Sequence, residues 1–267
     1  MTSFPPSKKR ILTLCLLVLV IALITIWWVF TPPAIDGKMH AVGYSVCHQI
    51  ESHSLAFGDK ILPLCARCTG MFLGTLIGLA VFSRRNKTSG SPSKGIIAIL
   101  VVFVLAFIFD GLNSMMGVFP IIPQLYPPSN LLRLVTGLMM GLVIANLLVV
   151  LWQQTWWKDS DPTPVLAGWK HFLLMVAANA LAGLLVWFRI PFLYYPVAIF
   201  STTAIVLLLS MIYSLIWIII FKKENTFERY SDGLSFVLAG LATAIIQIGL
   251  LDLLRYNLTG TWQGFTF

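Results

Sequence analysis

The sequence predicts an all-α, polytopic membrane protein, a helix bundle with about seven transmembrane helices. Three observations support this prediction: 58% of the 267 residues are hydrophobic, only 10% are charged, and the mean hydropathy is +0.88. In soluble domains about a quarter of the residues are charged. We therefore expect residues 1–267 to form a single integral membrane domain, with the lipid bilayer as its main partner.

Seven apolar segments are long enough to cross a bilayer. A hydrocarbon core about 30 Å thick is spanned by a helix of about 20 apolar residues. The segments cover residues 11–30, 62–82, 96–118, 131–153, 172–190, 197–221 and 234–254. The first follows a basic cluster, as a signal peptide does, but it lacks a small-residue cleavage pattern. We expect it to remain as an anchor.

Lysine and arginine divide unevenly between the two sides of such a bundle. If the N-terminus is inside, about two thirds of the 18 basic residues lie on the inner side, as the positive-inside rule requires. We predict a multi-pass protein of the plasma (cytoplasmic) membrane with its N-terminus in and its C-terminus out. Because the basic residues are dispersed over separate inner loops, the net charge of +8 does not indicate nucleic-acid binding. Protein partners and oligomeric state stay open.

Glycines recur at helix-packing spacing in two of the predicted spans. Gly70, Gly74 and Gly78 are four residues apart, and so are Gly137 and Gly141. Small residues at this spacing let helix backbones approach closely in a membrane. The pattern predicts tight packing and no reaction.

A cysteine-rich segment begins within residues 31–61, which we expect to form an extracytoplasmic loop, and continues into the start of the second predicted span. Three of the four cysteines of the chain are here, in the dipeptide Cys47-His48 and the pair Cys65-x-x-Cys68. Sulfur and nitrogen donors in this number suit the tetrahedral geometry that zinc prefers. We predict these four residues as metal ligands, with zinc as the favoured ion.

The same segment allows other interpretations. Neighbouring side chains such as Cys47 and His48 usually diverge, so His40 or His53 are alternatives to His48. Cys65 and Cys68 could instead form a disulfide, either purely structural or exchanging with Cys47 in a membrane thiol-disulfide oxidoreductase. In that case the intervening Arg67 would stabilise a thiolate. The fourth cysteine, Cys15, is expected to be an ordinary residue of the first span.

Ionisable residues within spans are costly and usually have a partner or a function. Asp110 and Arg133 are at similar predicted depth on consecutive spans, so we expect them to pair, and they are also the catalytic candidates. Asp252 and Arg255 lie at the same predicted end. We expect one outward-facing pocket near the thiols. Its predicted members are Arg67, Asp110, Asn113, Asn130 and Arg133.

The motifs resemble a known family. The order CHQ, then PLCARCTG running into a glycine-spaced helix, is similar to the signature of a prokaryotic family of predicted multi-pass membrane proteins, domain of unknown function 2085. Asp110-Gly111 and the N-x-x-R-x-x-T-G segment that begins at Asn130 match as well. The resemblance covers about residues 40 to 145. It implies a membrane protein and carries no assigned activity; the basic residue expected before Ser54 is His53 here.

We expect an integral membrane protein with an outward-facing Cys/His site that binds metal. The alternatives are the oxidoreductase, acting through Cys65 and Cys68, and a small-solute transporter or channel. The last is disfavoured because the inner halves of the spans carry few charges and no pair of broken spans occurs. Whether the protein is an enzyme stays open. A metal with an open position would allow hydrolysis with Asp110 as general base.

Overall fold

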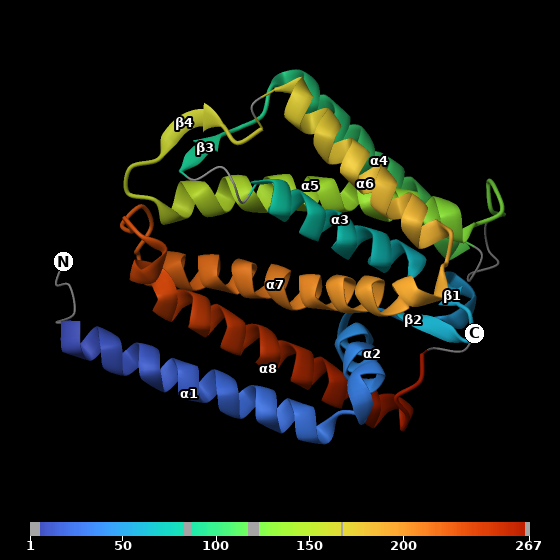
Figure 1. The fold of residues 1–267 in the computed structure, drawn as a ribbon, viewed down its shortest axis with the longest axis horizontal. Coiled ribbons are helices and arrows are strands. Elements are labelled where there is room, and N and C mark those ends of the chain that lie inside the picture. Colours follow the sequence, from blue (N-terminus) through green and yellow to red (C-terminus); the bar gives the residue numbers. More distant parts are fainter. Residues whose placement is uncertain (1–5, 83–86, 117–122, 167, 265–267) are drawn as a thin grey trace.

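The computed structural model describes residues 6–82, 87–116, 123–166 and 168–264. Within these ranges the chain is a bundle of helices with two small two-stranded sheets (Figure 1). The helices are α1 (Pro6–Phe30), α2 (Ala34–Val46), α3 (Ala66–Phe82), α4 (Lys94–Met116), α5 (Asn130–Trp156), α6 (Trp169–Trp187), α7 (Tyr194–Ile220) and α8 (Leu234–Thr259). Short 3₁₀ turns occupy Glu51–His53, Pro191–Leu193 and Tyr230–Gly233.

The helices lie side by side. In Figure 1, α3, α5 and α7 are in the middle, with α8 and α1 on one side and α4 and α6 on the other. Buried apolar residues of α3, α5 and α7, such as Leu73, Leu138 and Ala198, pack together in the core. α1 begins at one end of the bundle and α8 ends at the other. An odd number of membrane-spanning helices places the start of the first and the end of the last at opposite ends of a bundle in this way.

The predicted all-α membrane architecture is confirmed. Six described helices are long and apolar enough to cross a membrane, namely α1, α4, α5, α6, α7 and α8. α3 corresponds to the remaining predicted span and has 17 residues. The span was expected to begin at approximately Leu62, and it begins four residues later, because residues up to Cys65 form a strand. Pro63 explains the difference, since proline disfavours a helical residue before it and cannot donate a helix hydrogen bond. The predicted end of the third span at Val118 lies outside the described residues.

α3 and α5 pack as the glycine spacing predicts. A Cβ atom added to Gly70 would overlap the carbonyl oxygen of Leu134, and one added to Gly137 would overlap that of Arg67. Farther along the pair, a Cβ on Gly74 would lie 2.7 Å from the carbonyl oxygen of Leu138. Residue numbers rise together along both helices, so the two helices are parallel. Their close contact fixes the start of α3 against α5.

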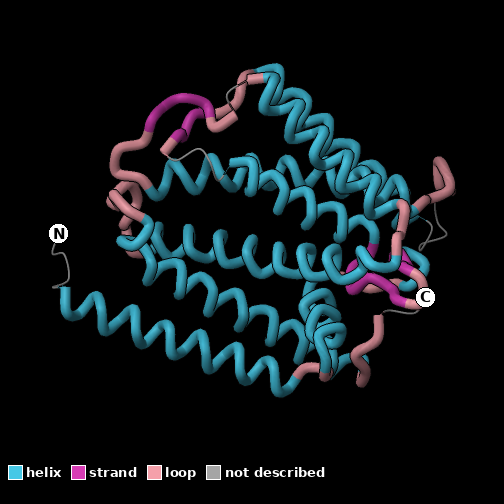
Figure 2. Tube along the Cα trace, in the orientation of Figure 1, coloured by secondary structure: helices cyan, strands magenta, loops and turns pink. Residues whose placement is uncertain are grey.

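The two small sheets lie at opposite ends of the bundle (Figure 2). β1 (Ser54–Phe57) and β2 (Lys60–Cys65) form an antiparallel hairpin, whose turn contains Gly58 at a φ of 66°. At the far end β3 (Thr88–Gly90) pairs in parallel with β4 (Asp161–Pro164). Residues 31–61, expected as a loop, therefore contain α2, a 3₁₀ turn and most of the hairpin. The 13 residues of α2 are too few to cross a bilayer.

Candidate metal centre

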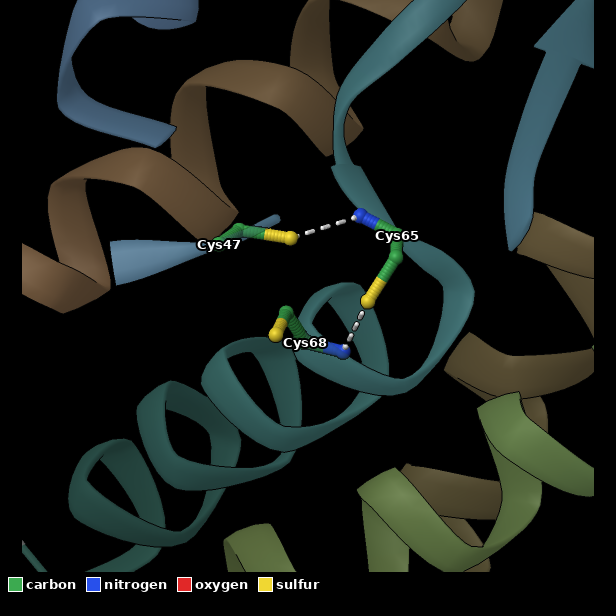
Figure 3. Close-up of side chains that lie close together, drawn as sticks. All are labelled: Cys47, Cys65 and Cys68. Carbon is green, nitrogen blue, oxygen red and sulfur yellow. Dashed lines mark hydrogen bonds between the residues drawn. The ribbon is translucent and has the colours of Figure 1, made fainter. Parts of the chain in front are cut away.

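Three cysteines from different elements meet where α2, the hairpin and α3 come together. Cys47 caps the C-terminus of α2, Cys65 ends β2, and Cys68 is in the first turn of α3. Figure 3 shows the three side chains gathered in one place. All three Sγ atoms lie within 4.8 Å of one another. Cys47 and Cys65 are only 5% and 3% exposed, so this is a shielded cluster of three thiols.

Backbone amides point at two of the sulfurs. The amides of Cys65 and Gln49 donate to Cys47 Sγ at 3.3 and 3.5 Å, and the amide of Cys68 donates to Cys65 Sγ at 3.5 Å (Figure 3). The amide of Cys68 is available because the first turn of a helix leaves its N–H groups unpaired. These donors favour negative charge on sulfur.

The thiols do not ionise independently. Hydrogen bonds from the thiols of Cys65 and Cys68 lower the pKa of Cys47 well below its ordinary value, although burial opposes this. The pKa of Cys65 is raised to about 12, first by its hydrogen bond to Cys47 and then by burial. Cys47 is therefore expected to lose its proton before Cys65 does. A bound cation would favour ionisation of the other two as well.

The histidines lie around the thiols and not among them. Within the described part of the chain, the close group of metal-type ligands contains the three cysteines and no histidine. The Nδ1 atom of His48 accepts the amide of Ile50 at 3.3 Å, and a hydrogen bond from the His48 side chain also helps to lower the pKa of Cys47. The His53 ring is 5.3 Å from the His48 ring, centroid to centroid. Burial lowers the pKa of His53 to about 4, and the charge of Arg133 adds to this.

Arg255 of α8 holds the turn that carries Cys47. Its guanidinium donates to the carbonyl oxygens of Tyr44 at 2.7 Å, Cys47 at 2.6 Å and His48 at 3.1 Å, and it lies 3.9 Å from the centre of the Tyr44 ring. Asp252, one turn earlier, accepts the indole N–H of Trp27 at 3.0 Å. The predicted convergence of α8 and the thiol segment at one end of the bundle is thus present. Its physical basis is hydrogen bonding from Arg255 to the backbone.

The prediction that Asp110 pairs with Arg133 is wrong. Asp110 forms an ion pair of 2.5 Å with Arg67, and it also accepts hydrogen bonds from Tyr126 at 2.9 Å and Thr136 at 3.3 Å. Arg133 instead donates to Asn130 at 2.8 Å. Arg67 lies one residue from Cys68 but its guanidinium is directed at α4, where it also reaches Ser114 at 3.0 Å. It therefore joins α3 to α4.

The two asparagines of the predicted pocket bind backbone. Asn113 donates to the carbonyl oxygen of Tyr126 at 2.9 Å and accepts the amide of Leu125 at 2.8 Å. Asn130 donates to the carbonyl oxygen of Ser52 at 3.0 Å. With both carboxylate oxygens of Asp110 engaged, these polar residues form a network that fixes α3, α4, α5 and their connections.

Two important residues were not foreseen from the sequence. The side chain of Gln49 donates to the carbonyl oxygens of His40 at 3.0 Å and Pro63 at 2.8 Å, so it ties α2 to the hairpin. Its place in the CHQ motif was the available indication. Tyr126 lies in a connection without any pattern of its own, and nothing in the sequence points to its bond with Asp110.

The thiols are compatible with a bound metal ion. Tetrahedral zinc with Zn–S bonds of about 2.3 Å places its sulfur ligands about 3.8 Å apart. The three sulfurs, already within 4.8 Å of one another, need only small movements to reach that spacing. All four cysteines of the chain are free thiols in this structure. The donor set is soft and partly ionised, as zinc and similar metals require.

Residues 47–147 match a family described as "Predicted membrane protein (DUF2085)", so the expected resemblance is confirmed. An uncharacterised protein of Methanocaldococcus jannaschii is 28% identical over 109 residues, which are 40% of this chain and 63% of that protein. An uncharacterised protein of Methanothermobacter thermautotrophicus is 29% identical over 109 residues, 40% of this chain and 86% of that protein. The match therefore spans less than two thirds of the first relative. No solved structure matches the chain.

Proposed function

Because residues 47–147 match a family of predicted membrane proteins, we propose that this multi-pass membrane protein binds one metal ion, with zinc favoured, through Cys47, Cys65 and Cys68. The observation that carries the proposal is the meeting of three sulfurs within 4.8 Å. A disulfide uses two sulfurs and would leave one buried thiol unused. Metal ligation uses all three and neutralises the charge that the backbone amides favour on them.

The fourth coordination position is the part of the site that decides its role. A structural zinc site is filled by four protein ligands, whereas a catalytic one keeps a position for water or substrate. We propose His48 Nε2 as the fourth ligand, because Nδ1 already accepts the amide of Ile50 and a hydrogen bond at one ring nitrogen orients the other. Asp110 is assigned no catalytic step, since Arg67, Tyr126 and Thr136 already occupy its oxygens.

We also propose that the site faces the extracytoplasmic side of the plasma membrane. The distribution of lysine and arginine supports this orientation. In an oxidising compartment a bound metal would protect the three thiolates from oxidation.

Metal content and thiol chemistry test the proposal together. Protein purified without added metal or chelator is expected to hold about one zinc per chain by elemental analysis. Cys65→Ser should lose the metal, whereas Cys15→Ser should keep it, because Cys15 is an exposed residue of α1. A membrane-impermeant alkylating reagent applied to intact cells should label the three thiols slowly, and faster after a chelator is added.

A thiol-disulfide oxidoreductase is the second candidate, and one observation favours it. Cys65 precedes α3 and accepts the amide of Cys68, and a cysteine at a helix N-terminus is a common redox arrangement. In that case Cys65 and Cys68 would form a disulfide and pass two electrons and two protons to an oxidised dithiol partner. Substoichiometric metal with a Cys65–Cys68 disulfide in purified protein would contradict the metal proposal and support this one.

A further inference from the structure

A cavity lies at the same end of the bundle as the thiols. Its volume is about 630 Å³, and the cysteines do not line it. Its walls come from α2, the CHQ turn, the hairpin, the start of α7 and the C-terminal tail. The lining residues that carry the argument are Asp36, His40, Gln49, Glu51, Tyr194 and Trp262.

The charge of this cavity is opposite to that of the whole chain. The sequence has 18 basic and ten acidic residues, yet the described residues that line the cavity include two carboxylates, Asp36 and Glu51, and no lysine or arginine. His40 does not offset them. Its Nε2 donates to the carbonyl oxygen of Trp262 at 2.6 Å, and burial lowers its pKa. Because Lys60 pairs with Asp36 from outside the lining, the negative charge of the lining comes from Glu51.

Two acceptor oxygens of the lining have no hydrogen-bond donor. Gln49 is only 9% exposed; its Nε2 donates to two carbonyl oxygens, and its Oε1 has no partner. The amide cannot be reversed, because Oε1 would then face the carbonyl oxygens of His40 and Pro63. Oδ1 of Asp36 is also a buried atom without a donor, in a side chain that is 43% exposed and is bound at Oδ2 by Lys60 and Tyr195. Buried acceptors in this state are costly unless a ligand or water supplies N–H or O–H groups.

The surroundings already hold one ammonium group. Lys60 donates from outside the lining to Oδ2 of Asp36 at 2.9 Å, and its Nζ lies 5.1 Å from the centre of the Tyr194 ring. Tyr194 and Trp262 provide aromatic walls, and aromatic faces attract cations. Asp36 and Tyr194 thus already bind an ammonium group, that of Lys60.

We propose that this cavity binds a small organic cation that carries N–H donors, a primary ammonium compound. Its N–H groups would satisfy Gln49 and Asp36, its charge would be balanced by Glu51, and its carbon chain would lie against Trp262. The cavity contains none of the proposed metal ligands, and Gln49 connects the two sites because its backbone amide donates to Cys47 Sγ.

The test uses the full-length protein in detergent and 1,4-diaminobutane as probe. Isothermal titration calorimetry should show that 1,4-diaminobutane binds saturably at one site per chain. Tetramethylammonium, which carries charge but no N–H donor, should bind at least tenfold more weakly, because it cannot satisfy the two acceptors. Magnesium chloride at equal ionic strength should not compete. Equal binding of all three cations would overturn the proposal, because it would indicate general charge attraction.

Variants at an exposed carboxylate separate binding from folding. Glu51→Gln should weaken diaminobutane binding by about fivefold, and Glu51→Lys should abolish it, because charge is removed or reversed near the ammonium. Asp159→Asn removes an exposed carboxylate at the opposite end of the bundle and should bind as the unmodified protein does. The melting temperatures without ligand should stay equal. Binding that is unchanged in Glu51→Lys, or absent from the unmodified protein, would also overturn the proposal.

Discussion

The two ends of the bundle hold their connections in different ways. At the thiol end, Arg255 binds three backbone carbonyls and Arg67 is paired with a buried carboxylate, Asp110. At the opposite end, the rings of Trp156 and Phe227 pack with their centres 4.8 Å apart. Hydrogen bonds fix the positions of particular atoms, whereas apolar packing fixes mainly distance and volume. The comparison indicates that charged hydrogen bonds position the backbone near the thiols, whereas aromatic packing holds the connection around Trp156.

The ion pairs of the two ends show the same contrast. The side chains of Arg67 and Asp110 are 18% and 3% exposed, whereas those of Lys158 and Glu228 are 56% and 64% exposed. Exposed pairs contribute little because water screens them and long side chains must be ordered. Breaking a buried pair leaves a charge without compensation. Of these two described ion pairs, the one between Arg67 and Asp110 is therefore expected to contribute more to stability.

The largest effect is expected at the aromatic end. Trp156 is fully buried, and its ring lies 4.9 Å from that of Trp152. Trp156→Ala should lower the free energy of unfolding in detergent by about 3–5 kcal/mol, because it opens a cavity. The metal content of the folded protein should not change. Trp169→Ala is the control, since Trp169 is 49% exposed. Loss of metal from folded Trp156→Ala would show that the two ends are not independent.

A smaller loss is expected when the buried ion pair is broken. Asp110→Asn and Arg67→Gln should each lower the free energy of unfolding by about 3 kcal/mol, because one charge stays buried without its partner. The double variant should recover part of this loss. In a second cycle, Asp110→Asn and Arg133→Gln should couple more weakly than Asp110→Asn and Arg67→Gln, because Arg133 is hydrogen-bonded to Asn130 and interacts with Asp110 only through its charge. Coupling of Asp110 to Arg133 and not to Arg67 would contradict the observed pairing.

Of these variants, those at Arg255 should lower the free energy of unfolding least. They should nevertheless lower the metal affinity most. Arg255→Gln should lower the free energy of unfolding by about 2 kcal/mol, because charged hydrogen bonds to carbonyls are lost. It should weaken metal affinity by roughly tenfold, as is typical when a residue that orients ligands is removed. Competition with a chelator measures this affinity. Arg255→Lys keeps the charge but lacks the planar guanidinium, so it should recover only part of the lost metal affinity. Unchanged metal affinity in both variants would show that Arg255 does not help to position the thiols.

The membrane helices were predictable because hydropathy is a local property. The start of α3, which lies at the site, was less predictable from the sequence, because Pro63 and pairing with β1 make the preceding apolar residues a strand. α2 was missed because 13 mixed residues resemble a loop as much as a helix. The meeting of Cys47 with the Cys65-x-x-Cys68 pair was predictable from ligand number alone.

The partners of the charged residues were harder to predict. Sequence places Asp110, Arg67 and Arg133 at similar depth, but the rotation of α3 and α4 about their axes decides which arginine meets the carboxylate. Arg255 and the Cys47 carbonyl are 208 residues apart in the chain. No local pattern encodes such a contact, because it depends on how the last helix packs against the first loop.

The contact between Arg255 and the Cys47 turn has a consequence for biogenesis. Chains are made from the N-terminus, and early segments begin to fold before late ones exist. Cys47, Cys65 and Cys68 are therefore synthesised long before α8 can supply Arg255, or the tail can place Trp262 beside His40. During this interval the thiols lack the clamp that holds them in the finished protein. Loading of a metal, or oxidation, would be easiest before the ribosome releases the last helix.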